Sequence, residues 1–171
     1  MTNYFEVLNI EPAFILDEAD LRKSFYELSL DYHPDRYGLK SEEEQMEALQ
    51  KSTLINTAFK ILSDKYSRMR HLLEITGIEF AEGNESVSQE FLAELMDINE
   101  LIMDYKLDPD QKIKENILTQ ISSLNSNLLN TVDEILTNFE IQKADKKQLE
   151  LIKDYYLKCK YLKRVELNLE N

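Results

Sequence analysis

The chain has 171 residues, of which 20 are Lys or Arg and 33 are Asp or Glu, giving a formal net charge of -13 at pH 7. This length holds one or two small domains. Nucleic acid is not an expected partner, because phosphate binding requires a basic face and the acidity extends over both halves. Only three glycines and three prolines are present, which favours an all-α protein over a sheet.

A single cysteine, Cys159, excludes an internal disulfide and any metal site built from several cysteines of this chain. It lies in an apolar helical register, which is typical of a core residue. No apolar run approaches the length needed to cross a bilayer, and the first residues carry neither a signal core nor an Arg-rich targeting helix. We therefore expect a cytoplasmic protein with no membrane partner.

The first half of the sequence predicts a short helix, a long helix, a loop and a second, antiparallel long helix. The short helix spans Asn3–Leu8. Asp17 begins the first long helix, and Ser41 with Glu44 has the capping-box spacing that begins the second. The apolar positions expected to face each other are Leu21, Phe25, Leu28 and Tyr32 in the first, and Ile55, Ala58, Phe59 and Leu62 in the second.

The tripeptide His33-Pro34-Asp35 separates the two long helices. Proline lacks a backbone donor and biases the residue before it away from helical angles, so the first helix should end at Tyr32. This predicts an exposed, stiffened loop that carries an imidazole and a carboxylate. Such a tripeptide alone is also an ordinary helix-terminating turn; the two flanking helices favour a functional interpretation.

A third helix through Arg68–Ile75 is expected to end at Gly77, where glycine suits a left-handed C-cap. The least patterned stretch begins at Gly83-Asn84, where we place a domain boundary. Beyond it, Ser88 has the position of an N-cap for a helix that continues to about Tyr105.

Two further helices complete the second half. Asp108-Pro109 predicts the start of one, with proline in the first turn where its missing amide is harmless. Its apolar positions are Ile113, Ile117, Ile121, Leu124, Leu128, Val132, Ile135 and Phe139. Asp145 opens the last helix, with apolar positions Leu149, Ile152, Tyr156, Cys159, Leu162 and Leu169. We expect an antiparallel bundle rather than a coiled coil over Gln111–Glu140, because the apolar seam drifts from a strict heptad.

Three segments of the first half resemble the J-domain family: Tyr4-Phe5, Tyr32-His33-Pro34-Asp35-Arg36 and Ile55-Asn56-Thr57-Ala58-Phe59. The resemblance implies that His33, Pro34 and Asp35 contact the ATPase domain of a DnaK-class chaperone and stimulate its ATP hydrolysis. Arg22, Lys23 and Arg36 are the basic residues expected to join this contact. Glu27 and Asp31 interrupt that basic surface, which fits a dedicated partner better than broad, electrostatically steered docking.

Over nearly its whole length, the chain is similar to the HscB family of iron–sulfur assembly co-chaperones. The similarity lies in Arg68–Leu73 with Gly77, in Phe91–Met96 and in Lys160–Leu162. It implies a J-domain over residues 1–77, a linker over residues 78–87 and a C-terminal three-helix bundle over residues 88–171.

The helix from Ser88 to Tyr105 carries more apolar surface than one core contact needs. Phe91, Leu95, Ile98, Ile102 and Tyr105 form a core stripe, whereas Leu92, Met96 and Met103 form a second strip with an acidic border. The strip either packs against the J-domain or the third helix, or it binds a protein. Methionines adapt to a partner's shape and acidic rims select a basic partner, which favours a protein-binding face. The HscB resemblance assigns an IscU-type iron–sulfur scaffold to Leu92, Ala93, Met96, Asp97, Glu100, Asp104 and Tyr161. Ala93 and Asp97 depart from the family's usual methionine and glutamate.

An enzymatic interpretation of His33 and Asp35, or a metal site shared with His71, lacks an accompanying nucleophile or phosphate-binding loop. We expect no catalysis, no cofactor and no metal, and we interpret His71 as a partly buried packing residue. The expected function is that of a co-chaperone that binds an IscU-type scaffold and stimulates ATP hydrolysis by an HscA/DnaK-class chaperone. The alternatives are a J-domain adaptor for another protein client and a purely structural helical interaction protein.

Overall fold

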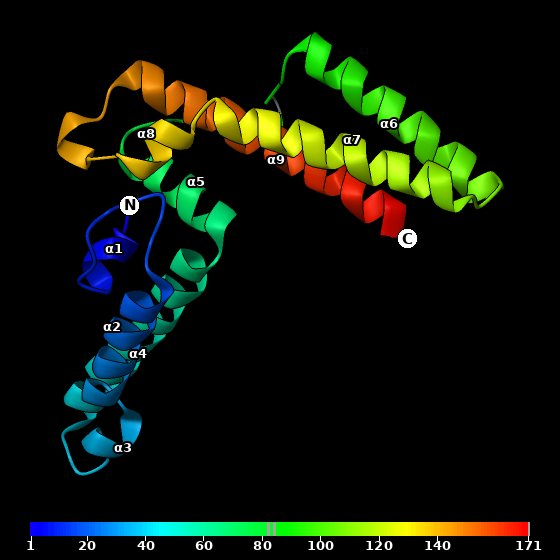
Figure 1. Ribbon diagram of the computed structural model, residues 1–171. Coiled ribbons are helices and arrows are strands. Elements are labelled where there is room, and N and C mark those ends of the chain that lie inside the picture. The colour runs from blue at the N-terminus through cyan, green and yellow to red at the C-terminus, as the bar shows by residue number, and fades with distance from the viewer. Residues whose placement is uncertain (82, 84, 171) are drawn as a thin grey trace. The chain divides into compact units, whose positions relative to one another are not determined.

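The computed structural model describes residues 1–81, 83 and 85–170, and every regular element in these ranges is a helix (Figure 1). The all-α prediction is therefore confirmed. The chain forms two compact units, which are described separately: Met1–Gly77 with Phe139–Ala144, and Ile78–Asn138 with the chain from Asp145 onward. Three residues lie outside the described ranges: Glu82 and Asn84, both in the predicted linker, and Asn171, the last residue of the predicted bundle.

The first unit begins with five helices. They are α1 (Tyr4–Val7), α2 (Glu18–Asp31), α3 (Pro34–Tyr37), α4 (Glu42–Ser63) and α5 (Lys65–Ile75). Side chains cap their N-termini as the sequence predicts: the Asp17 carboxylate accepts from the backbone of Ala19 and Asp20, and Ser41 and Glu44 form a complete capping box. Gly77 follows α5 with a φ of 87°, in the left-handed region expected of it.

The packing of α2 against α4 makes the centre of the first unit (Figure 1). The rings of Phe25 and Phe59 stack with their centroids 4.2 Å apart, and Leu21, Ala58 and Leu62 are buried beside them. Burial of such side chains contributes about 1.5–3 kcal/mol each relative to exposure. The predicted apolar faces of the two long helices therefore meet.

Arg68 links α5 by hydrogen bonds to the end of α4 and to the segment that contains Phe14. Its Nε donates to the carbonyl of Phe14 at 3.1 Å, and its guanidinium also donates to the carbonyl of Leu62 at the end of α4. Burial lowers the pKa of Arg68, and the Asp64 carboxylate opposes that shift. The hydrogen bonds offset the cost of burying the guanidinium and satisfy two backbone acceptors that helix and loop geometry leave open.

The second unit is built on three long helices, each of which contacts the other two. They are α6 (Gln89–Leu107), α7 (Gln111–Asn130) and α9 (Lys146–Glu170); the short α8 (Asp133–Thr137) follows α7. Ser88 caps α6 by accepting from the backbone of Phe91, as predicted. The buried side of α6 is Phe91, Leu95, Ile98 and Ile102, which confirms four of the five predicted core positions; Tyr105 is half-buried.

Two predictions about α7 are wrong. Asp110 rather than Asp108 caps it, so Pro109 precedes the helix, and the helix ends at Asn130 rather than continuing to Phe139. The Thr131 hydroxyl donates to the carbonyl of Leu128 at 2.7 Å, an alternative bond that competes with helix continuation. Phe139 instead belongs to the first unit, where its ring meets Phe14 edge-on at 4.6 Å and the 3₁₀ turn η1 (Ile141–Lys143) follows.

His71 of α5 is a core residue of the first unit and only 3% exposed. Its Nε2 accepts the backbone N–H of Tyr4 at 3.0 Å, and its ring packs against the rings of Tyr4 and Phe5. Acceptance at Nε2 requires the neutral imidazole. Burial lowers the pKa of His71, and the Glu74 carboxylate opposes that shift only in part.

The stability of the first unit should fall as the pH drops below about 6.5, the value at which an unfolded histidine titrates. Because the folded pKa of His71 is lower, the unfolded state binds more protons there, and the contribution of neutral His71 is complete only above that pH. In His71→Phe the loss of unfolding free energy between about pH 7.5 and about pH 5.5 should shrink. At the higher pH this variant should be about 1–2 kcal/mol less stable, since the Tyr4 N–H loses its acceptor. Urea unfolding at each pH measures both effects.

The control is His33→Gln, which removes the exposed histidine and leaves the contacts of His71 with Tyr4 and Phe5 in place. An equal slope in His71→Phe and the parent would show that other groups cause the loss.

Candidate functional site

His33, Pro34 and Asp35 form the start of a short helix rather than an open loop. His33 is the N-cap of α3 with extended backbone angles, and Pro34 occupies the first turn, where its fixed φ suits a helix. The His33 Nδ1 accepts the backbone N–H of Asp35 at 3.3 Å and lies 3.6 Å from the Asp35 Oδ2. The sequence predicted the helix break but missed this turn.

When Nδ1 accepts this backbone N–H, the imidazole carries its proton on Nε2. The ring therefore shapes the turn through one nitrogen and presents an N–H donor with the other. The Asp35 side chain is 91% exposed, so its carboxylate is open to a cation on another protein. The arrangement suits a charge-assisted contact.

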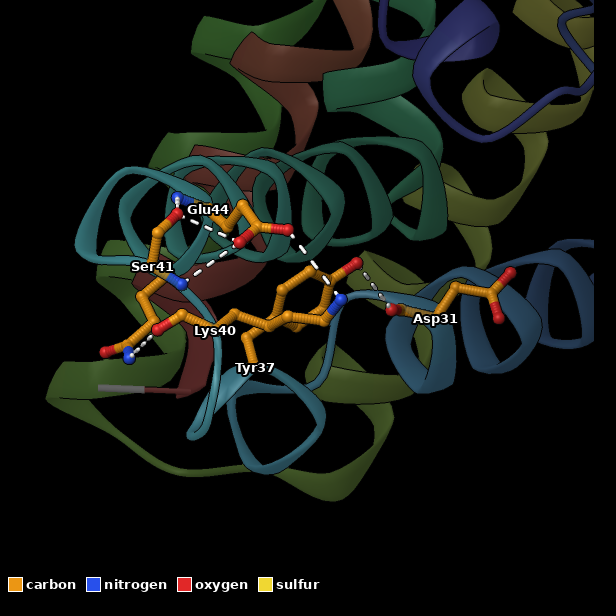
Figure 2. A network of polar contacts seen from close by, with 6 residues as sticks. Asp31, Tyr37, Lys40, Ser41 and Glu44 are labelled. Carbon is orange, nitrogen blue, oxygen red and sulfur yellow. Dashed lines mark hydrogen bonds and ion pairs between the residues drawn. The ribbon is translucent and has the colours of Figure 1, made fainter.

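The turn is anchored to the end of α2 by Arg36 and Tyr37. The Arg36 Nη1 donates to the Leu30 carbonyl at 3.0 Å and to the Asp31 Oδ1 at 3.1 Å. The Tyr37 hydroxyl donates to the Asp31 carbonyl at 3.3 Å (Figure 2). These bonds satisfy carbonyls that the last turn of a helix leaves without an intrahelical partner. The chain thus supplies Arg36 with partners of its own.

On its other side, the turn runs into the capping box of α4 (Figure 2). The Glu44 carboxylate accepts from both the backbone N–H and the hydroxyl of Ser41, and Lys40 Nζ lies 3.8 Å from its second oxygen. The backbone N–H and hydroxyl of Ser41, together with Lys40, hold the pKa of Glu44 below its usual value. Gln45 adds a bond to the Lys40 carbonyl at 3.0 Å. The turn is therefore fixed at both ends.

Arg22 and Lys23 do not form one patch with the turn. Arg22 is paired with Glu18 at 3.0 Å and lines a hollow that Phe25 and Phe59 also line. Lys23 lines a different hollow, bounded by the segment from residue 9 to residue 17. The two cations thus face different sides of α2, and nine residues of helix, about 14 Å, separate Arg22 from Asp31.

The predicted scaffold residues lie on the solvent side of α6. Leu92 is 38% exposed, and Met96 and Met103 are each 65% exposed. Within this unit, therefore, neither methionine is buried against the other helices, and packing of these two side chains against the third helix is wrong. Ala93, Asp97, Glu100 and Asp104 are exposed on the same helix, and Tyr161 of α9 is half-buried. The sequence missed Leu107, which is 84% exposed at the end of this helix. We call Leu92, Met96 and Met103, with Asp97, Glu100 and Asp104, the α6 ridge.

The described residues contain no candidate metal site and no candidate membrane-spanning helix. No group of three or more His, Cys, Asp or Glu side chains there is arranged to hold a metal ion. No helix within residues 1–81, 83 and 85–170 is both long enough and apolar enough to span a bilayer. Cys159 is 2% exposed within α9, which confirms its predicted place in the core.

Residues 3–71 match the family described as DnaJ domain, and residues 87–170 match the family described as HSCB C-terminal oligomerisation domain. A co-chaperone protein HscB homolog of Neisseria meningitidis is 32% identical over 122 residues, covering 71% of this chain and 74% of the relative. The chain belongs to the HscB co-chaperone family. The HscB homolog of Pseudoalteromonas atlantica is 28% identical over 171 residues, covering 98% of this chain and 94% of its own.

The fold agrees with that of a solved family member. The chaperone HscB from Vibrio cholerae superposes with a TM-score of 0.81 at 24% identity, covering 98% of this chain and 96% of its own. The chain therefore contains a J-domain and a C-terminal helical domain, as the sequence predicted. Its J-domain implies a partner chaperone of the Hsp70 type.

Replacing Arg36 by Ala should loosen the turn without unfolding the J-domain. The variant loses the side-chain bonds to Leu30 and Asp31. The backbone amides at positions 32 and 36 close the end of α2 and the start of α3. Their hydrogen exchange should become about two- to fivefold faster. Hydrogen exchange followed by NMR measures this. Arg22→Ala is the control, because its exposed pair with Glu18 lies elsewhere on α2. Unchanged exchange in Arg36→Ala would mean that Arg36 does not hold the turn.

Proposed function

We propose that this protein is a co-chaperone that binds an IscU-type iron–sulfur scaffold and stimulates ATP hydrolysis by an HscA/DnaK-class chaperone, which promotes cluster maturation and transfer. The observation that carries the proposal is the His33-Pro34-Asp35 turn, fixed at both ends with its carboxylate exposed. Family membership and the exposed α6 ridge support the scaffold half. A cytoplasmic location is part of the same proposal.

On the chaperone side, Asp35 meets a cation of the ATPase domain, and His33 offers its Nε2 proton beside it. A fixed turn loses little conformational entropy on binding, so more of the contact energy appears as affinity. The ATP and its magnesium belong to the chaperone. Lys23 and Arg22 add attraction from α2, while Arg36 acts chiefly by holding the turn.

On the scaffold side, Leu92 and Met96 are the apolar anchors of the α6 ridge. Ala93 leaves room beside them, Tyr161 adds an aromatic edge from α9, and Asp97, Glu100 and Asp104 favour a basic surface opposite. The cluster travels with the scaffold as cargo. A J-domain adaptor for a different client remains the second candidate, and it keeps the turn while losing the scaffold contact.

His33→Gln should abolish ATPase stimulation while the protein stays folded, because the imidazole ring that caps the turn beside Asp35 is lost. A steady-state ATPase assay with the chaperone measures stimulation, and circular dichroism measures folding. His33→Asn is the matched variant: asparagine restores an N-cap oxygen but supplies no ring, so it separates capping from contact. Full stimulation by a folded His33→Gln protein would contradict the proposed chaperone contact.

Replacing Leu92 and Met96 together by Ala should weaken scaffold binding by about 2–4 kcal/mol, since both would be buried anchors in the complex. Isothermal titration with purified scaffold measures the affinity. The double variant should still stimulate the chaperone in the absence of scaffold. The matched control replaces Leu118 and Leu151 by Ala; these are 49% and 52% exposed in the same unit but lie outside the ridge. Equal weakening by both pairs would place the scaffold site elsewhere.

A further inference from the structure

A groove of about 220 Å³ runs between α6 and α7, beside the α6 ridge. Two carboxylates, Glu94 and Asp97, line it from α6, and Ile98 and Leu124 contribute apolar surface, being 3% and 9% exposed. Gln120, Ser123 and Asn127 of α7 complete the lining. Asp97 is shared with the ridge, so the groove continues the surface already proposed to bind the scaffold.

Among the described residues, no ion pair includes a carboxylate of α6, which distinguishes this helix from α2, α4, α5 and α9. Within the described part of the chain, α2, α4, α5 and α9 pair acidic side chains with a cation one turn away, for example Glu18 with Arg22 and Asp154 with Lys158. Across the same residues no ion pair includes Glu94 or Asp97. The sequence explains this, because no Lys or Arg occurs from Ala81 through Tyr105.

The α7 side of the groove supplies acceptors and no competing charge. Residues 116–132 contain no charged side chain at all. Gln120 donates its Nε2 to the Asn116 Oδ1 at 3.2 Å, so its carbonyl oxygen is the atom left to accept from a ligand. With the Ser123 hydroxyl and the Asn127 amide, the groove presents mainly acceptors around two carboxylates.

We infer that this groove receives an arginine side chain of the scaffold, which would extend the scaffold-binding surface from α6 onto α7. The inference rests on the proposed function. Arginine fits better than lysine, because its planar fork makes several hydrogen bonds at once and its aliphatic stem packs on Ile98 and Leu124. Glu94, which lies outside the ridge, adds its charge to that of Asp97, so the groove is complementary to a cation.

Two neighbouring serines of α7 provide the test. Ser123 lines the groove and Ser122 does not, although both are exposed, so Ser123→Lys and Ser122→Lys add the same charge one residue apart. The lysine at position 123 should pair with Glu94 and Asp97 and exclude the partner's arginine. We expect scaffold affinity to fall about tenfold for Ser123→Lys and less than about twofold for Ser122→Lys, with the difference shrinking at high salt. Equal affinities for the two variants overturn the inference.

A probe separates this inference from the proposed function. Titration of the full-length protein with N-acetyl-arginine amide, followed by NMR, should shift the backbone amides of Ser123 and Asn127 in the parent and not in Ser123→Lys. Absence of these shifts overturns the groove inference even if the scaffold binds through the ridge. Failure of the parent to bind scaffold, with the shifts present, overturns the scaffold half of the proposed function and the scaffold as the source of the arginine, while the groove itself still binds arginine. Sedimentation of each variant completes the set: self-association lost only in Ser123→Lys would identify a second copy as the occupant and overturn the inference.

Discussion

The antiparallel packing of α2 against α4 is the constraint on which the position of the His33-Pro34-Asp35 turn depends. The stacked rings of Phe25 and Phe59, with Leu21 and Leu62 beside them, set the distance and angle at which the two helices run. Between Asp31 and Glu42 the chain must then cross from one helix to the other within a short span, and α3 fills it. Because Arg36 ties that turn to α2 and Glu44 closes the start of α4, the position of Asp35 follows from a core many residues away. The packing of this core therefore constrains the geometry of the turn around Asp35.

Much of the fold was predictable because its signals are local. Ser41 with Glu44, Ser88 and Gly77 each occupy a helix end that their own chemistry favours, and the structure places them there. The error in α7 has a different origin. Val132 and Leu136 are buried after the helix breaks, so burial continues across a gap that periodicity alone does not reveal. Phe139 is placed by Phe14, 125 positions earlier in the chain, and no window of neighbouring residues contains that contact.

The candidate sites were predictable to different extents for the same reason. The positions of residues around the helix axis alone separate the core stripe of α6 from the strip that holds Met96. The structure agrees, because most side chains of the stripe are buried and those of the strip are exposed. The sequence predicts Arg36 as a cation available to a partner, because it does not show which carbonyl groups of the chain lie near the guanidinium. The groove beside Asp97 depends on how α7 is rotated against α6, which is a property of the assembled bundle. Predictions thus succeeded for most helix ends and for the apolar faces of the helices. They failed at the two ends of α7 and for contacts that depend on residues far apart in the chain.

Cys159 has a practical consequence for studying this protein. Its thiol is the only one in the sequence, and the residue is 2% exposed on α9. Buried thiols in apolar surroundings are poorly nucleophilic, so maleimide dyes and spin labels will react with it slowly while the protein is native. A cysteine engineered onto any solvent-facing helix turn would then be the single fast-reacting thiol. The protein is by this feature a ready background for site-selective fluorescent labelling, with no need to remove the natural residue first.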